Sequence, residues 1–361
     1  MKNFHQQPFD EATLTKLDLF RRYIREWLPV FLYSKGSSSK IRIIDFFAGP
    51  GRDTNGNAGS PLIALEEIRK YRKDILRTSS KVHLELNEKA KEKADHLREV
   101  LASEDIQRDL CSWNVENHDF EQAFSNLLPQ IKRDPSLLLL DQQGVKFISD
   151  KIFRTLIKLE KTDFIFFTAS STWRRFETHP SLRKYFSLSR GAVTTKVFND
   201  THRAVTDYYK DLVAKSAKKF FLGSFSIKKG SNIYGLIFGS SHPLGIEKFL
   251  KLCWEKDPLR GEANFDIDEE NINNETPSLF PELDVPKKLQ IFQSQLEKQI
   301  LSNRLTTDGK IFIACLEAGF LPAHGRDVVK KLIKMGRIRC SGHPRISQDG
   351  YKEPRDLQII P

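Results

Sequence analysis

The sequence has few cysteines, no long apolar run and no internal repeat, and each absence removes a class of protein. Its 361 residues include only four cysteines, at positions 111, 253, 315 and 340, and none belongs to a C-x-x-C pair. A disulfide framework is therefore not expected. A metal centre is not expected either, because no cluster of His, Cys, Asp or Glu has the spacing of metal ligands. No stretch approaches about 18 consecutive apolar residues, and the first residues lack the apolar core of a signal peptide. We expect a cytoplasmic protein without a membrane partner.

What the sequence does have is positive charge, unevenly distributed. Its 58 Lys and Arg against 47 Asp and Glu give a formal net charge of +11. Residues 264–286 hold seven acidic and no basic side chains, whereas residues 287–361 hold 14 basic and seven acidic ones. Basic surfaces often bind polyanions, although solvated Lys and Arg are also common on ordinary surfaces. The pattern predicts a main domain over 1–268, an acidic linker over 269–286 and a basic module over 287–361, and it favours nucleic acid as a partner.

Apolar runs alternate with amphipathic stretches through the first half of the chain. Strands are predicted at 40–49, 81–87, 109–115, 136–141 and 163–170, and helices at 10–33, 60–71, 88–103 and 149–161. This alternation predicts an α/β fold with a doubly wound, mostly parallel sheet. Asp10 and Ser60 are the expected N-caps, and the first helix is expected to stop near Pro29. Two apolar runs within 218–241 are joined by Lys-Lys-Gly-Ser, which predicts a terminal antiparallel hairpin.

The strongest chemical motif is the turn after the first strand, IRIIDFFAGPGR over 41–52. Ligands of open α/β sheets bind at the carboxyl ends of strands, where small residues allow close approach. A dinucleotide site needs G-x-G-x-x-G directly before a helix, but here the helix begins only near residue 60. The turn instead resembles the first motif of methyltransferases that use S-adenosylmethionine (SAM), with a glycine turn that binds nothing as the simpler alternative. The resemblance implies a pocket for the methionine part of SAM at Asp45, Phe47, Ala48, Gly49 and Gly51.

Acidic residues are also predicted at the ends of the next two strands. Glu85 is predicted to end the second strand, where a carboxylate can accept hydrogen bonds from both ribose hydroxyls. Asp119 follows the third strand, where it can accept a hydrogen bond from the adenine amino group. Each residue alone is also compatible with an ordinary surface carboxylate. Together with Asp45 they favour a cofactor that contains adenosine.

The chain as a whole resembles the three-Cys-motif partner protein family, a bacterial group with a methyltransferase-like fold. The matching segments include IIDFFAGPGR, LLLLDQQG, KTDFIFFTASSTWRRF and DPLRGEANFDID, and they cover most of 1–268. The resemblance implies a seven-stranded sheet of the class I methyltransferase type with SAM as the cofactor. It also implies a separate partner, a three-cysteine protein that resembles a radical-SAM enzyme.

The residues that follow the fourth and fifth predicted strands are the candidates for chemistry. This chain has Asp141-Gln142-Gln143-Gly144 where many relatives have Asp-Pro-Phe-Gly or Asp-Pro-Tyr-Gly. Methylation of a base amino group through an Asn/Asp-Pro-Pro-aromatic turn is therefore disfavoured, and so is methylation of cytosine carbon 5, which needs a Pro-Cys nucleophile. The candidate catalytic residues are Asp141, Gln142, Ser171 and Arg174. Trp173 and Arg175 are candidates for binding a base and a phosphate, with an ordinary helix start as the alternative.

The C-terminal module shows the succession helix, helix, strand and turn, which resembles a winged helix. In DNA-binding winged helices the second of these helices enters the major groove. Winged helices also dock onto proteins, and the acidic linker is able to fold back onto the module. The sequence favours a SAM-binding methyltransferase-like protein that acts on nucleic acid or with its three-cysteine partner, and the alternative is a non-catalytic adaptor of the same fold. The basic residues expected to contact nucleic acid or a partner are Lys330, Lys331, Lys334, Arg337 and Arg339.

Overall fold

The computed structural model describes residues 8–34, 40–104, 110–141, 148–169, 201–216, 218–230, 232–272 and 285–360. The chain divides into two compact units, Met1–Phe220 with Ser226–Ser241, and Phe221–Phe225 with His242–Pro361. In this division the helix after residue 242 belongs with the C-terminal unit, whereas the sequence analysis placed it in the domain over 1–268. The boundaries at 268 and 286 stay a prediction.

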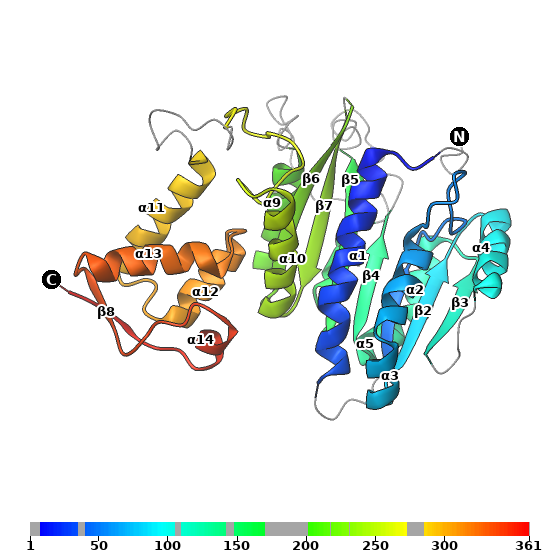
Figure 1. Ribbon diagram of the computed structural model, residues 1–361, viewed down its shortest axis with the longest axis horizontal. Coiled ribbons are helices and arrows are strands. Elements are labelled where there is room, and N and C mark those ends of the chain that lie inside the picture. Colours follow the sequence, from blue (N-terminus) through cyan, green and yellow to red (C-terminus); the bar gives the residue numbers. More distant parts are fainter. Residues whose placement is uncertain are drawn as a thin grey trace. The chain divides into compact units, whose positions relative to one another are not determined.

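A seven-stranded sheet organises the first unit (Figure 1). Its strands run in the order β3-β2-β1-β4-β5-β7-β6. Neighbours from β3 to β5 pair in parallel, whereas β7 runs antiparallel to β5. This order with one reversed strand is that of the class I methyltransferases, so the predicted fold class of the sheet is confirmed, and the winged-helix-like module stays a prediction. The strands are β1 (Lys40–Asp45), β2 (Lys81–Asn87), β3 (Cys111–Glu116), β4 (Ser136–Leu140), β5 (Thr162–Ala169), β6 (Phe221–Lys229) and β7 (Asn232–Ser240).

Helices cover both faces of this sheet, as the alternation of strands and helices predicts. Figure 1 looks onto the face covered by α1 and α2, with α5 behind the strands. All five residues of β4 are buried, which places the core around the centre of the sheet. The helices of this unit are α1 (Glu11–Leu32), α2 (Ser60–Lys70), α3 (Arg72–Thr78), α4 (Lys91–Ser103), α5 (Phe120–Arg133), α6 (Asp150–Leu156) and α9 (Thr201–Ala214).

Helix α1 continues past Pro29, so the predicted stop at that residue is wrong. The helix ends at Leu32. A proline inside a helix leaves the carbonyl four residues earlier without its amide donor. That carbonyl belongs to Arg25, and the hydroxyl of Tyr71 donates to it at 3.0 Å. A donor from a neighbouring element thus replaces the missing backbone hydrogen bond.

Polar contacts form at the start and near the middle of α1. Asp10 is the N-cap, as predicted, and its carboxylate accepts from the Thr13 amide at 2.9 Å. Further along the helix, the buried Tyr23 hydroxyl donates to the Asp163 carboxylate on β5 at 2.6 Å. The Tyr23 ring also packs edge-on against Phe238 of β7 at a centroid distance of 4.9 Å. These contacts direct the N-terminal end of α1 toward the carboxyl ends of the parallel strands.

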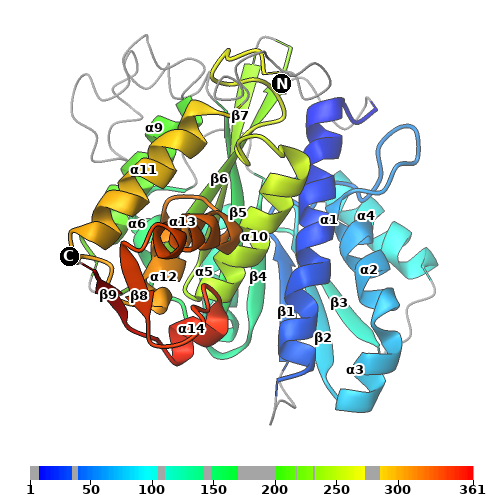
Figure 2. The ribbon, with the colours of Figure 1, turned by 60° about the vertical axis from the view of Figure 1, so that its left-hand side comes forward.

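The second unit is mainly helical and ends in a short two-stranded sheet (Figure 2). Its aromatic core joins α10 to the helices that follow, since the Trp254 indole donates to the Gly319 carbonyl at 3.1 Å. The Phe292 and Phe320 rings stack at 3.9 Å. Strands β8 and β9 pair antiparallel after the third helix of the module. The elements are α10 (Pro243–Lys256), α11 (Lys287–Leu301), α12 (Asp308–Glu317), α13 (Pro322–Lys334), β8 (Ile338–Cys340), α14 (Gln348–Lys352) and β9 (Leu357–Ile359).

The two ends of the predicted acidic linker are bound within this unit. Arg260 is 3% exposed and lies within 2.9 Å of the Asp266 carboxylate and 2.8 Å of the Glu270 carboxylate. The other oxygen of Glu270 accepts from the amide of Lys287, at the start of α11, at 3.0 Å. The acidic residues near position 270 therefore neutralise a buried arginine.

Candidate functional site

Asp45 lies at the carboxyl end of β1 and holds the following turn in place. Its side chain is 2% exposed and accepts hydrogen bonds from the Phe47 amide at 2.9 Å and the Ser60 hydroxyl at 2.6 Å. Burial raises the pKa of Asp45 to about 7; the hydrogen bonds act against that rise, and the charges of Asp141 and Glu88 add to it. The site therefore contains a buried acid that titrates near neutral pH.

Ser60 serves this carboxylate and is not the N-cap that the sequence predicts. The N-cap of α2 is Gly59, which has no side chain that could cap the helix. Ser60 is the first helical residue, with Pro61 behind it. A serine hydroxyl either caps its own helix or bonds elsewhere, and here the nearby Asp45 carboxylate is the acceptor.

The glycine turn closes back onto the sheet through backbone contacts. Gly49 and Gly51 have φ of 65° and 90°, a region that favours glycine. A Cβ on Gly51 would lie 2.9 Å from the terminal methyl group of Leu97 on α4, so that side chain would have to shift in addition to the strain of the positive φ. The Gly49 amide donates to the Glu88 carboxylate at 3.1 Å, which joins the turn to the end of β2.

Asn87 connects three strand ends, and the sequence analysis missed it. This residue is 2% exposed at the end of β2. Its amide nitrogen donates to the carbonyls of Phe46 and His118 at 3.2 and 3.1 Å, and its oxygen accepts from the His118 amide at 3.1 Å. The loops after β1, β2 and β3 are thereby fixed to one another. A single asparagine after an apolar strand gives no sequence signal of this kind.

Glu85 does not end β2, so that prediction is wrong; the strand continues to Asn87. Its carboxylate lies 2.5 Å from Arg42, which also contacts Asp134 at 2.8 Å. Burial raises the pKa of Glu85, and the charge of Arg42 opposes the rise. The acidic side chain beside the glycine turn is instead Glu88, immediately after the strand. The predicted range of this strand, 81–87, matches the structure, and Glu85 lies two residues before its end.

Asp119 lies where the sequence predicts it, directly after the loop that follows β3. It is the N-cap of α5 and accepts from the Gln122 amide at 3.1 Å. The next residue, Phe120, stacks on the predicted site residue Phe47 at 5.4 Å with an interplanar angle of 20°. Ala48 is buried, and its amide donates to the Asn87 carbonyl at 3.0 Å. The structure thus brings the turn after β1 and the start of α5 together.

Asp141, at the carboxyl end of β4, is bound by a lysine from the first helix. The Lys16 ammonium lies 2.9 and 2.7 Å from its two carboxylate oxygens and 4.6 Å from the centre of the Phe167 ring on β5. Sequence analysis missed Lys16, because 125 residues separate the partners. The other predicted residues of this region, Gln142, Ser171, Trp173, Arg174 and Arg175, lie outside the described residues.

The described part of the chain contains neither a metal-binding cluster nor a helix that could span a membrane. No group of three or more His, Cys, Asp or Glu within it is arranged to hold a metal ion. Each helix in the described ranges is too short or too polar to cross a membrane. The four cysteines are unpaired by disulfides, and burial raises the pKa of Cys111, Cys253 and Cys315.

The basic residues predicted in the C-terminal module lie at its surface. Lys330, Lys334, Arg337 and Arg339 are exposed, and the exposed Lys331 also pairs with Glu297 of α11 at 3.2 Å. Three of these residues belong to α13, and the other two follow it. The module therefore presents cations on one helix and the adjoining strand.

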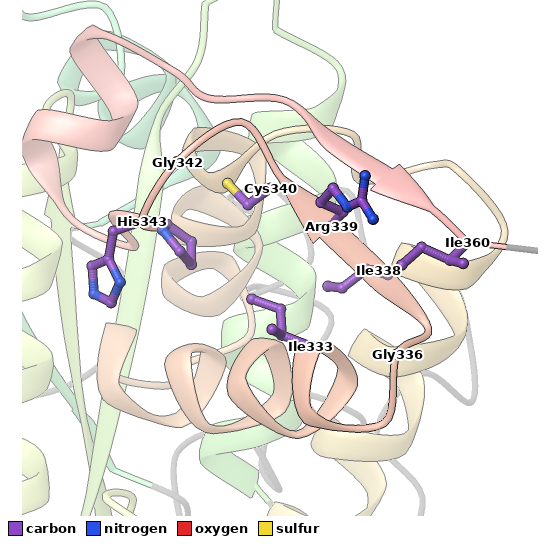
Figure 3. Close-up of a pocket in the computed structure, with 9 residues that line it drawn as sticks. Ile333, Gly336, Ile338, Arg339, Cys340, Gly342, His343 and Ile360 are labelled. Atoms are coloured by element: carbon purple, nitrogen blue, oxygen red, sulfur yellow. The ribbon is translucent and has the colours of Figure 1, made fainter.

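A hollow of about 490 Å³ lies beside these cations (Figure 3). Ile333 of α13 and Ile338 of β8 line it together with Ile360, and Arg339 and His343 add polar groups. Ile333 remains 39% exposed, whereas Ile338 is 2% exposed. The sequence analysis did not find this hollow, because it forms only where β8 folds back against α13.

Comparisons with known proteins identify similar folds. No protein-family model and no curated protein sequence matches this chain. Among solved structures, Trm1 from Pyrococcus horikoshii, determined in complex with SAM, matches over 64% of this chain with 11% identity and a TM-score of 0.36. The match spans 56% of the length of that protein. TYW2 from M. jannaschii, also in complex with SAM, matches over 64% of this chain and 76% of its own, with 9% identity and a TM-score of 0.32.

Proposed function

We propose that this protein is a SAM-binding, methyltransferase-like protein. The observation that carries the proposal is the buried Asp45 beneath a glycine turn, at the carboxyl edge of a sheet with the class I methyltransferase strand order. In open α/β sheets this edge is where ligands bind. The matches to Trm1 and TYW2 are too distant to add residue-level support.

The residues at this edge fit the chemistry of SAM. Asp45, Glu88 and Asp141 supply three carboxylates for a ligand that has a sulfonium and an ammonium group. Phe47, which stacks on the buried Phe120, offers aromatic surface for adenine, and Asp119 carries a carboxylate for the adenine amino group. When bound, SAM supplies an electrophilic methyl group. The role of this chain's residues is to bind the cofactor, orient it and exclude water around it.

Calorimetry with SAM, its demethylated product S-adenosylhomocysteine and NAD tests the cofactor. We expect the two adenosyl compounds to bind in the micromolar range and NAD not to bind. Absence of SAM affinity below millimolar would reject the proposal. NAD binding without SAM binding would instead favour a nucleotide-dependent oxidoreductase.

We further propose that the macromolecular substrate is nucleic acid, contacted through the winged-helix-like module. Support comes from the exposed cations on α13 and β8, which suit the phosphate backbone. The family resemblance adds the three-cysteine protein as a second participant. Transfer of a tritiated methyl group from SAM to DNA or RNA, with and without that partner, tests this part. Methyl transfer to the partner protein alone would contradict it.

A second candidate function is binding without methyl transfer. It is favoured by Asp141, whose carboxylate is already bound by Lys16 and is followed by no proline that rigidifies the turn. An adaptor of this kind would bind SAM and nucleic acid yet transfer no methyl group to DNA, RNA or the partner. The tritium assay therefore separates the two functions.

A further inference from the structure

The ion pair between Lys16 and Asp141 joins the first helix to the proposed cofactor edge. Lys16 is 15% exposed and Asp141 is 38% exposed, so the pair is partly shielded from water. The lysine approaches both carboxylate oxygens, and the ring of Phe167 lies beneath its ammonium group. This environment holds a positive charge at one position.

Asp141 lies close enough to the glycine turn for its charge to act there. Its negative charge contributes, after burial, to the raised pKa of Asp45, and the charge of Glu88 contributes as well. Three carboxylates thus converge on the ends of β1, β2 and β4. Within the described part of the chain, Lys16 is the basic side chain that pairs with any of the three.

The methionine part of SAM ends in an ammonium and a carboxylate on the same carbon. Placed among three carboxylates, the anionic half of this group would be repelled unless a cation lay beside it. The Lys16–Asp141 ion pair supplies one positive and one negative charge side by side. If the amino-acid end of SAM enters between the two side chains, its carboxylate lies beside the lysine and its ammonium beside the aspartate. Each charge then keeps a neighbour of opposite sign, so little Coulomb energy is lost.

We infer that Lys16 and Asp141 bind the amino-acid end of SAM, with the Lys16 ammonium donating to its carboxylate and the Asp141 carboxylate accepting from its ammonium. This assignment rests on the proposed function. It makes the N-terminal helix part of the cofactor site. It also explains why an amphipathic helix places a lysine toward the sheet at the second turn, where an apolar residue would pack on Phe167.

Two ligands that differ in this end group test the inference by calorimetry. S-adenosylhomocysteine has the amino-acid end, and 5′-methylthioadenosine lacks it. In Lys16→Gln we expect affinity for S-adenosylhomocysteine to fall on the order of ten- to a hundredfold, the loss of one charge-assisted hydrogen bond. Affinity for 5′-methylthioadenosine should stay within about twofold, because that ligand has no group for Lys16 to bind.

Two further variants show whether charge is the cause. Lys16→Arg should keep most of the affinity, because it retains a cation at the same site. Arg22→Ala removes a cation two turns away on α1, where it pairs with Asp18, and should leave both affinities unchanged. Thermal unfolding of each variant verifies that the fold is intact.

The possible failures are distinguishable. If the unaltered protein binds neither ligand, the proposed function is wrong and this assignment falls with it. If it binds both and Lys16→Gln weakens both equally, or neither, only the role of Lys16 is overturned. The role of Lys16 is also overturned if Lys16→Arg loses as much affinity for S-adenosylhomocysteine as Lys16→Gln does.

Discussion

At the scale of single residues, the sheet contains acids and bases in very different surroundings. Asp45 and Asp163 are buried with hydroxyl and amide donors but without a basic partner among the described residues, and their pKa values rise to about 7 and about 6. Glu85 and Asp134 are instead paired with the buried Arg42. Stability should therefore depend on pH through the first pair and on an intact arginine through the second.

The Asp45 environment predicts that stability falls as pH rises from about 4 to 7. A raised folded-state pKa means that the native protein keeps a proton that the unfolded chain releases in this range. The shift spans roughly three pH units, worth up to about 4 kcal/mol of unfolding free energy at about 1.4 kcal/mol per unit. Asp45→Asn should flatten the decline seen in urea unfolding, because its amide oxygen can still accept from the Phe47 amide and its NH2 group can donate to the Ser60 hydroxyl, and the amide does not titrate.

Asp163 contributes a decline of the same sign, so some pH dependence should remain in Asp45→Asn. Asp95→Asn, at an exposed position, serves as the control. An identical slope in Asp45→Asn and in the unaltered protein would show that Asp45 ionises normally.

Arg42→Met should be strongly destabilising. It would leave the nearly buried carboxylates of Glu85 and Asp134 without their shared cation, at a cost of about 3–5 kcal/mol. Arg77→Met is the matched control, since Arg77 is 67% exposed and its pair with Asp74 is worth less than about 1 kcal/mol. Equal losses in chemical denaturation would mean that the Arg42 network is not needed for stability.

At the scale of helices and strands, apolar periodicity predicted most elements well, whereas the roles of particular residues at or near their ends were predicted poorly. The sheet and its reversed hairpin follow from local patterns in the chain. The errors at Pro29, Ser60 and Glu85 share a physical cause: each depends on a partner far away in sequence. The Tyr71 hydroxyl donates to the Arg25 carbonyl that Pro29 leaves unpaired, the Asp45 carboxylate accepts from Ser60, and Glu85 pairs with Arg42. The Lys16–Asp141 pair escaped notice for the same reason.

The reversal of β7 predicts a sensitive glycine. Gly239 lies opposite Phe164 of β5, and a Cβ there would come within 2.2 Å of the Phe164 ring. Gly239→Ala should cost about 3 kcal/mol in unfolding free energy through overpacking. Gly230→Ala in the hairpin turn meets no atom within 4 Å and should cost only about 1 kcal/mol for its positive φ.

A second substitution tests whether the Phe164 ring is the cause. Gly239→Ala combined with Phe164→Leu should lose less stability than the two single variants added together, because the smaller side chain relieves the clash. Strict additivity would argue against the register of β5 and β7 described above.

At the scale of the whole molecule, the charged residues behind the net charge of +11 lie in different surroundings. The acidic residues near position 270 neutralise the buried Arg260, while the cations of α13 and β8 remain exposed. The sequence predicted the excess of positive charge but not which carboxylates pair with a buried arginine. The proposed binding of nucleic acid should therefore depend on the C-terminal module.

Salt dependence tests that placement. Replacing Lys330, Lys331 and Lys334 with Glu should reduce the slope of log affinity against log salt by about 3, roughly one for each phosphate that the module no longer neutralises. The control reverses Lys40, Lys73 and Lys81, exposed residues of β1, α3 and β2, and changes the net charge equally. The same change of slope in both variants would show that only net charge matters.

The attachment of α1 to β5 also affects how the chain is made. Tyr23 finds its partner Asp163 only after 140 further residues have been joined, which takes roughly 7–30 s at ribosomal rates of about 5–20 residues per second. Throughout that interval the first helix, whose apolar side includes Phe20 and Trp27, lacks its anchor on β5. The nascent chain is therefore expected to keep part of this apolar side exposed until β5 is made, and faster translation up to β5 would shorten that exposure.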